Sequence, residues 1–174
     1  MNEFKKTLLF GTYEGVMQVL KNIDYGERIV SIIGPSIRPA ELKLLEKLSK
    51  KINIPLISQP KYNSLEYKNF ISKIHDLDYD SIISNSYSMI IRPDVLMYCN
   101  YNAINIHWSL LPLNRGPNPI QWAIIKGENY TGVTVHFIDD GLDTGDIIIQ
   151  QKIAIEDEDT WLSLKEKLIK TSNS

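Results

Sequence analysis

The sequence predicts an α/β fold, in which a Rossmann-like and mainly parallel sheet is flanked by helices and followed by a C-terminal antiparallel hairpin. Short apolar runs rich in β-branched residues alternate with longer segments of helical period, which is typical of βαβ units. Towards the C-terminal end, two apolar runs are joined by the turn-forming stretch DDGLDTG. That connection is too short for a crossover helix, so these two strands should pair antiparallel.

Each element follows from its own local pattern. The apolar runs predict strands at 6–10, 28–34, 54–58, 80–84, 102–107, 131–138 and 146–155. Apolar residues at helical spacing predict helices at about 14–23, from residue 39 onwards, over 64–77 and at about 118–126. A short helix should begin at Arg92-Pro93, because proline is favoured in a first helical turn. The last segment, from Asp159, opens with a Thr/Asp cap pattern and continues as an amphipathic helix.

Length and composition predict one ordinary globular domain over residues 1–174, since 43% of the residues are hydrophobic. The 19 Lys and Arg residues are balanced by 21 Asp and Glu residues, so the basic excess typical of nucleic-acid binding is missing. Cys99 is the single cysteine, which excludes an internal disulfide and a Cys-based zinc site and fits a reducing compartment. With neither a signal-peptide pattern nor a membrane-length apolar run, we expect a cytoplasmic protein without a membrane partner.

The first candidate for chemistry is the pair Asn105 and His107, at the end of the strand predicted over 102–107. Residues two apart in a strand face the same side, and ligands of open α/β sheets bind at the carboxyl ends of strands. An amide N–H donor beside an imidazole could stabilise and reprotonate an oxyanion at a carbonyl centre. From the residues alone, however, an isolated Asn-x-His pair more often caps loop backbone than it takes part in chemistry.

The other polar candidates are weaker when taken singly. Asp143 lies in FIDDGLDTGD, where aspartate and glycine are ordinary turn formers, and the loop lacks the spacing of a calcium site, so no metal is expected. His75 and His136 fit structural roles, and Ser109 is not part of a nucleophile elbow. The turn GTYEG is not a dinucleotide-binding motif, although a helix start there could hold an anion.

Several motifs in fixed order are more specific than any single residue. They are NIHWSLLPLNRG at 105–116, PIQWAI at 119–124, GE at 127–128, TGVTVH at 131–136 and DDGLDTGDI at 139–147. Together the motifs resemble the formyltransferases that use 10-formyltetrahydrofolate. A looser resemblance in LLFGTYEG and SYSMIIRP extends this similarity over nearly the whole chain.

The resemblance implies that a formyl group passes from the folate to a primary amine. The family's catalytic Asn, His and Asp fall on Asn105, His107 and Asp143. The first two would donate hydrogen bonds to the oxyanion, while Asp143 would orient His107 and help to remove a proton from the amine. The resemblance places the pterin against backbone groups of the segment with Met89, Ile90 and Ile91 and of the loop with Asp139 and Asp140. Ser109, Arg115 and Gly116 are the expected acceptor-side residues.

Within this family, the RG, PIQWAI and GLDTGD motifs are similar to the branch of methionyl-tRNA formyltransferases and sugar N-formyltransferases. Without a basic excess, the preferred acceptor is a nucleotide-linked amino sugar, with both substrates small molecules and no nucleic-acid partner. A methionyl-tRNA formyltransferase-like catalytic domain is the main alternative. A formyl hydrolase and a non-catalytic folate- or nucleotide-binding domain also stay open, and a homodimer is compatible with each.

Overall fold

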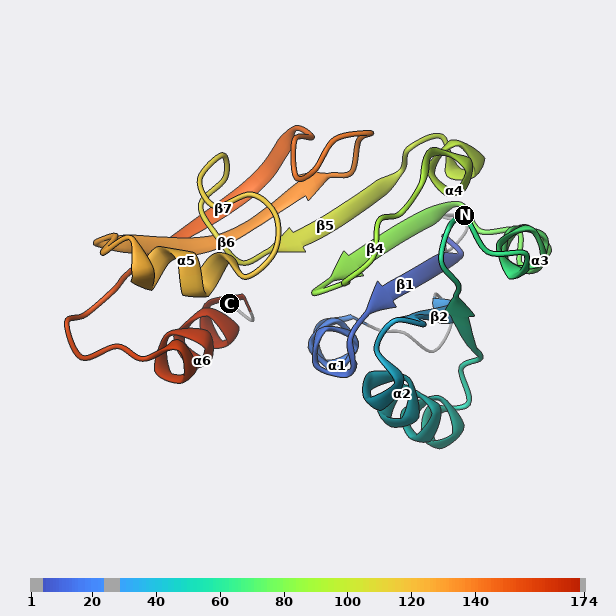
Figure 1. Cartoon of the computed structure of the whole chain (residues 1–174), viewed down its shortest axis with the longest axis horizontal. Helices are drawn as coiled ribbons and strands as arrows, with labels where there is room; N and C mark the ends of the chain where they lie inside the picture. The colour runs from blue at the N-terminus through green and yellow to red at the C-terminus, as the bar shows by residue number, and fades with distance from the viewer. Residues whose placement is uncertain (1–4, 24–28, 173–174) are drawn as a thin grey trace. The chain divides into compact units, whose positions relative to one another are not determined.

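The computed structural model describes residues 5–23 and 29–172 of the chain (Figure 1). These residues form two compact units that divide between Ala103 and Ile104. The prediction of one domain over residues 1–174 is not tested by this division and stays a prediction. Within the described ranges, no helix combines the length and the apolar character that a membrane crossing requires.

The first unit is built on four parallel strands in the order β3-β2-β1-β4. The strands are β1 (Thr7–Gly11), β2 (Ile29–Pro35), β3 (Leu56–Gln59) and β4 (Ser81–Asn85). The helices of this unit are α1 (Tyr13–Asn22), α2 (Pro39–Ile52), α3 (Glu66–His75), α4 (Pro93–Leu96) and the 3-10 helix η1 (Met97–Cys99). Helices α1 and α2 contact each other, and both lie below the strands in the view of Figure 1.

The local sequence explains how these elements pack. Thr12 caps α1 by accepting a hydrogen bond from the backbone N–H of Gly15. Leu45 and Leu48 of α2 are buried as their spacing predicts. Helix α2 lies close to β2, because a Cβ atom at Gly34 would come within 2.6 Å of a methyl group of Leu42. The unit therefore has a dense apolar core between α2 and its sheet.

The second unit begins within β5 (Ala103–His107) and adds β6 (Tyr130–Phe137) and β7 (Ile147–Ala154). Strand β6 pairs antiparallel with β5 and with β7. Helices α5 (Pro119–Ile125) and α6 (Trp161–Ser172) pack on each other and on β6. Their shared apolar core contains Ile120, Val133, Leu164 and Leu168.

The predicted fold class is confirmed, and the differences lie at element boundaries. The strand expected at 54–58 begins only at Leu56. Asn53 adopts a left-handed conformation with φ 56° and ends α2, and the N–H of Ile54 still bonds to the carbonyl of Ser49. Since Pro55 has no N–H to offer a strand neighbour, pairing starts after it. Residue 28 of the strand predicted over 28–34 and residues 173–174 of the last segment lie outside the described residues.

Candidate active site

Asn105 and His107 lie on one face of β5, as their spacing predicts. Strand β6 continues this site across the ladder, because Asn105 pairs with His136 and His107 pairs with Thr134. His107 is the last residue of β5 and is buried, and Asn105 is partly buried. The strand end therefore presents an amide and an imidazole to the loops that follow it.

Asp143 brings these two side chains together from the loop between β6 and β7. Its Oδ1 accepts a hydrogen bond from Asn105 Nδ2 at 3.3 Å, and its Oδ2 lies 3.5 Å from His107 Nδ1. The backbone N–H of Gly116 donates to Oδ2 at 2.8 Å and holds the carboxylate in place. Asp143 has φ 51°, a left-handed conformation that aspartate tolerates. The other two residues predicted as catalytic thus converge on the carboxylate of Asp143.

His136 also belongs to this cluster, although the sequence suggested only a structural role for it. Its Nε2 lies 3.1 Å from Asn105 Nδ2 and 3.5 Å from Asp143 Oδ1, and the side chain is almost fully buried. Its Nδ1 lies 2.8 Å from the carbonyl oxygen of Phe137, which can only accept, so Nδ1 carries a proton. No local sequence pattern marks His136, because its position opposite Asn105 depends on the pairing of β5 with β6.

For both His107 and Asp143, burial and the neighbouring polar groups shift the pKa in opposite directions. Burial lowers the pKa of His107 below its ordinary value, while the charge of Asp143 and the carbonyl of Asn114 oppose this shift. For Asp143, burial favours the neutral acid, but the contacts with His136, His107 and the Gly116 N–H outweigh burial and lower the pKa. The carboxylate is therefore ionised at neutral pH, beside an imidazole that can exchange a proton.

The second ring nitrogen of His107 is held by the loop that follows β5. His107 Nε2 lies 2.9 Å from the backbone carbonyl oxygen of Asn114. Because a carbonyl cannot donate, Nε2 is the protonated nitrogen of the neutral ring. Nδ1 is consequently the nitrogen left to face Asp143.

The loop that carries Asp143 is shaped by its own turn residues. Both carboxylate oxygens of Asp139 accept a hydrogen bond from the hydroxyl of Thr144, at 2.7 and 2.9 Å, and one also accepts from the N–H of Gly141. A Cβ atom at Gly145 would lie 2.0 Å from the carbonyl oxygen of Phe137, so this position requires glycine. Asp139 thus organises the loop, while Asp140 is exposed.

The three predicted acceptor-side residues differ in exposure. Ser109 is fully buried, and its hydroxyl donates to the carbonyl of Leu113 at 2.6 Å. Contrary to the expectation of a substrate contact, Ser109 therefore holds the loop after β5 from inside. Gly116 is also buried, with φ 83°, and contributes its N–H to Asp143. Arg115 alone of the three is exposed and available to a ligand.

In the first unit, the predicted folate segment lies in the loop between β4 and α4. Ile90 is 65% exposed, Met89 is partly buried and Ile91 is buried. Gln59, at the end of β3, donates from Nε2 to the carbonyl of Ile90 at 3.1 Å and accepts from the hydroxyl of Tyr87 at 3.0 Å. A buried glutamine therefore supports the segment that was predicted to bind the pterin.

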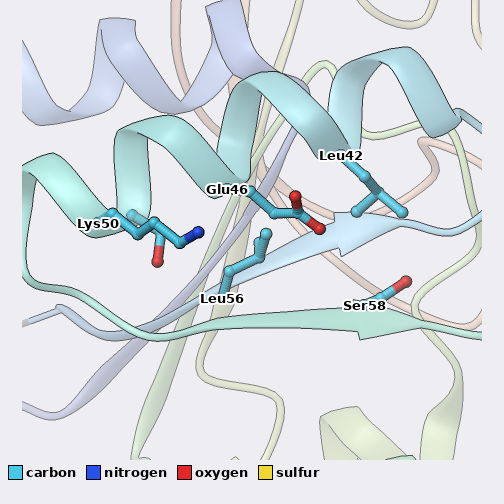
Figure 2. A pocket seen from close by; sticks show the side chains of 6 residues that line it. Leu42, Glu46, Lys50, Leu56 and Ser58 are labelled. Carbon is cyan, nitrogen blue, oxygen red and sulfur yellow. The ribbon is translucent and has the colours of Figure 1, made fainter.

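The first unit also has a hollow of about 450 Å³ between α2 and β3 (Figure 2). Figure 2 shows Glu46 and Lys50 from α2 above Leu56 and Ser58 of β3, and Leu42 and Ser49 complete the lining. None of the predicted site residues lines this hollow. In the described parts of the chain, no group of three or more His, Cys, Asp or Glu side chains is arranged to hold a metal ion.

Comparison with known families adds to this geometry. The family model described as formyl transferase matches residues 5–174. The chain belongs to the formyl transferase family. The match spans both compact units. The same family model therefore covers the parallel strands of the first unit and the polar cluster of the second.

Curated relatives agree with the family assignment. A methionyl-tRNA formyltransferase of Thermodesulfovibrio yellowstonii is 38% identical over 171 residues, which are 92% of this chain and 54% of the relative. One from Pelotomaculum thermopropionicum is 35% identical over 89% of this chain and 51% of its own length. The chain thus spans about half the length of these relatives. The names of these relatives mention no amino sugar.

Solved structures show the same fold. Phosphoribosylglycinamide formyltransferase from Bacillus halodurans is 27% identical, with a TM-score of 0.79 over 97% of this chain and 90% of that one. Glycinamide ribonucleotide transformylase 1 from Symbiobacterium toebii reaches a TM-score of 0.84 at 21% identity, covering 99% of this chain and 84% of the other. At that identity the likeness shows the fold alone.

Proposed function

We propose that the chain catalyses transfer of a formyl group from 10-formyltetrahydrofolate to a primary amine. The observation that carries this proposal is the convergence of Asn105, His107 and Asp143 at the end of β5, within a chain of the formyl transferase family. A hydrogen-bond donor, an imidazole and an ionised carboxylate are the groups that acyl transfer to an amine requires.

Each group has a role in the balanced reaction. The amine nitrogen attacks the formyl carbon, and the carbonyl oxygen becomes an oxyanion. Asn105 Nδ2 donates a hydrogen bond to that oxyanion, and His107 Nδ1 does so once it has taken up the proton of the amine. The contacts of both nitrogens with Asp143, at 3.3 and 3.5 Å, are long enough to give way to a substrate. The proton lost by the amine passes through the Asp143–His107 pair to the folate nitrogen, the oxyanion re-forms the carbonyl double bond, and the bond between the folate nitrogen and the formyl carbon breaks.

For the acceptor, the relatives favour the amino group of a methionyl-tRNA-like substrate. The methionyl-tRNA formyltransferases described above match 92% and 89% of this chain. Arg115 is exposed in the loop after β5, where its guanidinium could bind a phosphate of such an acceptor.

A nucleotide-linked amino sugar is the second candidate, and one observation favours it. The chain has 19 basic and 21 acidic residues, for a formal net charge of -2, which gives no general attraction to polyanionic RNA. A nucleotide diphosphate needs only a local cation, which Arg115 supplies.

A transfer assay with labelled 10-formyltetrahydrofolate tests the function and separates the two acceptors. We expect label in an acid-stable product with charged methionyl-tRNA and less or none with nucleotide-linked amino sugars. The matched variants Asn105→Ala and His107→Ala should each lower turnover about 100- to 10,000-fold. Release of free formate without any acceptor product would identify a hydrolase, and near-normal turnover in both variants would refute the proposed site.

A further inference from the structure

Outside the predicted catalytic residues, the most organised polar group around His107 is Asn114. The Asn114 carbonyl accepts from His107 Nε2 at 2.9 Å, so its direction determines where the imidazole ring points. Asn114 has φ 53°, a left-handed conformation that few residues other than glycine and asparagine adopt readily. The carbonyl is therefore aimed at His107 by an unusual backbone conformation.

The Asn114 side chain is clamped on both of its ends. Nδ2 donates to the two carboxylate oxygens of Glu128 at 3.1 and 3.0 Å, and Oδ1 accepts from Lys126 Nζ at 2.6 Å. A bond to each end of the amide leaves it one orientation, and the charged partners make these bonds stronger than neutral ones. Asn114 and Glu128 are partly buried, whereas Lys126 is exposed. We call these contacts of Asn114 with Glu128 and Lys126 the clamp. Of its two partners, Glu128 is the one better shielded from solvent.

Both arms of the clamp come from the turn that ends α5. Gly127 has φ 62°, its N–H bonds to the carbonyl of Ile124, and the N–H of Glu128 bonds to the carbonyl of Ala123. These two bonds around a left-handed glycine form the Schellman arrangement that terminates helices. The carboxylate of Glu128 is thereby tied to a defined helix end within the same unit as His107.

We propose that Asn114 and Glu128 are positioning residues that keep the Nε2 proton of His107 on the Asn114 carbonyl and leave Nδ1 as the reactive nitrogen. The assignment of Nδ1 to the reaction rests on the proposed function, while the placement of the proton does not. Without the clamp, the Asn114 backbone can leave its left-handed conformation. The His107 ring then loses its anchor, and both tautomers become accessible.

The test is ¹⁵N NMR of the ring nitrogens combined with kinetics. The chain has 3 histidines, so His107→Ala assigns the relevant signal. In the native chain we expect His107 to titrate from a neutral form with the proton on Nε2. Glu128→Ala should give a mixture of tautomers and lower kcat by up to about 100-fold, the cost of misplacing a reacting group. Glu128→Gln retains an acceptor oxygen for Asn114, so it should keep most of the native tautomer population and most of the native kcat.

Two further variants keep the proposal falsifiable. Asn114→Gly tolerates the left-handed backbone without strain but removes the side-chain amide that holds it there, so it should behave like Glu128→Ala. Glu158→Ala, at an exposed glutamate of the same unit, is the matched control and should change neither the spectrum nor kcat. An unchanged His107 tautomer in both Glu128→Ala and Asn114→Gly would overturn the proposal. Because the spectra require no turnover, this outcome is distinct from a failure of the formyl-transfer assay.

Discussion

Asp143 is the residue on which the polar groups of the site converge. Its two carboxylate oxygens face Asn105, His107, His136 and the N–H of Gly116. Removing the charge of Asp143 should therefore change the electrostatics of the site without disrupting the loop between β6 and β7. Asparagine suits this test, because it keeps an acceptor oxygen for Gly116 and tolerates the left-handed backbone at this position.

For Asp143→Asn we expect turnover to fall about 100- to 10,000-fold while the melting temperature changes little. The charge of Asp143 raises the pKa of His107 against the effect of burial. Its loss should therefore lower that pKa further, so His107 would be protonated only at a more acidic pH. Proton NMR titration of the ring measures this shift. An unchanged titration together with retained activity would leave Asp143 a turn residue.

Arg115 is exposed in the loop between β5 and α5 and offers a planar cation to the acceptor. We expect Arg115→Ala to raise the KM for the acceptor and to leave the KM for the folate unchanged, because it removes binding on one side of the site only. Arg38→Ala, at another exposed arginine, is the control. Varying each substrate in turn provides the measurement, and a loss confined to the folate would contradict the assignment.

At the scale of secondary-structure elements, the end of β3 supports the loop after β4. Gln59 is 2% exposed and links the hydroxyl of Tyr87 to the carbonyl of Ile90. Strand β3 is not itself part of the predicted folate segment, so its influence on folate binding acts through these two bonds.

We expect Gln59→Leu to weaken binding of a folate analogue about 3- to 10-fold for each bond that it removes. Gln59→Glu should weaken binding at least as much, because it no longer donates to Ile90 and places a buried carboxylate against that carbonyl oxygen. Fluorescence titration measures both affinities, and Gln151→Leu on exposed β7 is the control. Equal affinity in all three variants would show that the loop does not depend on Gln59.

Helix α6 depends on Asp159 just before its first turn. The carboxylate accepts from Lys167 Nζ at 2.6 Å, from the N–H of Glu156 at 2.9 Å and from the hydroxyl of Ser163 at 2.7 Å. The bond to Lys167, and then those to Glu156 and Ser163, lower the pKa of Asp159 from 3.8 to about 2. The folded state therefore binds a proton at this carboxyl less tightly than the unfolded chain does.

This depressed pKa predicts a stability contribution that is complete above pH 3.8 and is lost as the pH falls towards 2. At neutral pH, Asp159→Asn should cost about 1 kcal/mol, after allowance for solvent screening of the half-exposed lysine. The difference from the native chain should shrink across that acidic window. Urea unfolding at a series of pH values provides the measurement, and a pH-independent difference would exclude the ionic contribution.

At the scale of the whole molecule, binding of the donor should be visible without any acceptor. A ligand at 100 times its Kd stabilises the folded state by about 2.7 kcal/mol, which for a chain of this size corresponds to a rise of about 5–10 °C in melting temperature. We expect a non-reactive folate analogue to produce such a rise and free glutamate at the same concentration to produce none. Equal effects of both would contradict a pterin site.

Local pattern was sufficient for the fold class and for part of the site. Alternating β-branched runs and helical spacing predict the strands and helices because these signals depend on neighbouring residues. The two-residue period of a strand places Asn105 and His107 on one face, as β5 confirms. The exact start of β3 was missed, because a left-handed Asn53 and the imide of Pro55 delay the pairing.

Only the tertiary structure decided which polar residues complete the cluster and which do not. His136 joins Asn105 through strand register, Asp143 reaches it from a loop 38 residues further along, and Asn114 meets Glu128 across 14 residues. Ser109, which the resemblance placed on the acceptor side, is fully buried. Such contacts depend on the pairing of strands and the closure of loops, which bring together residues far apart in the chain and leave no periodic signal in the sequence.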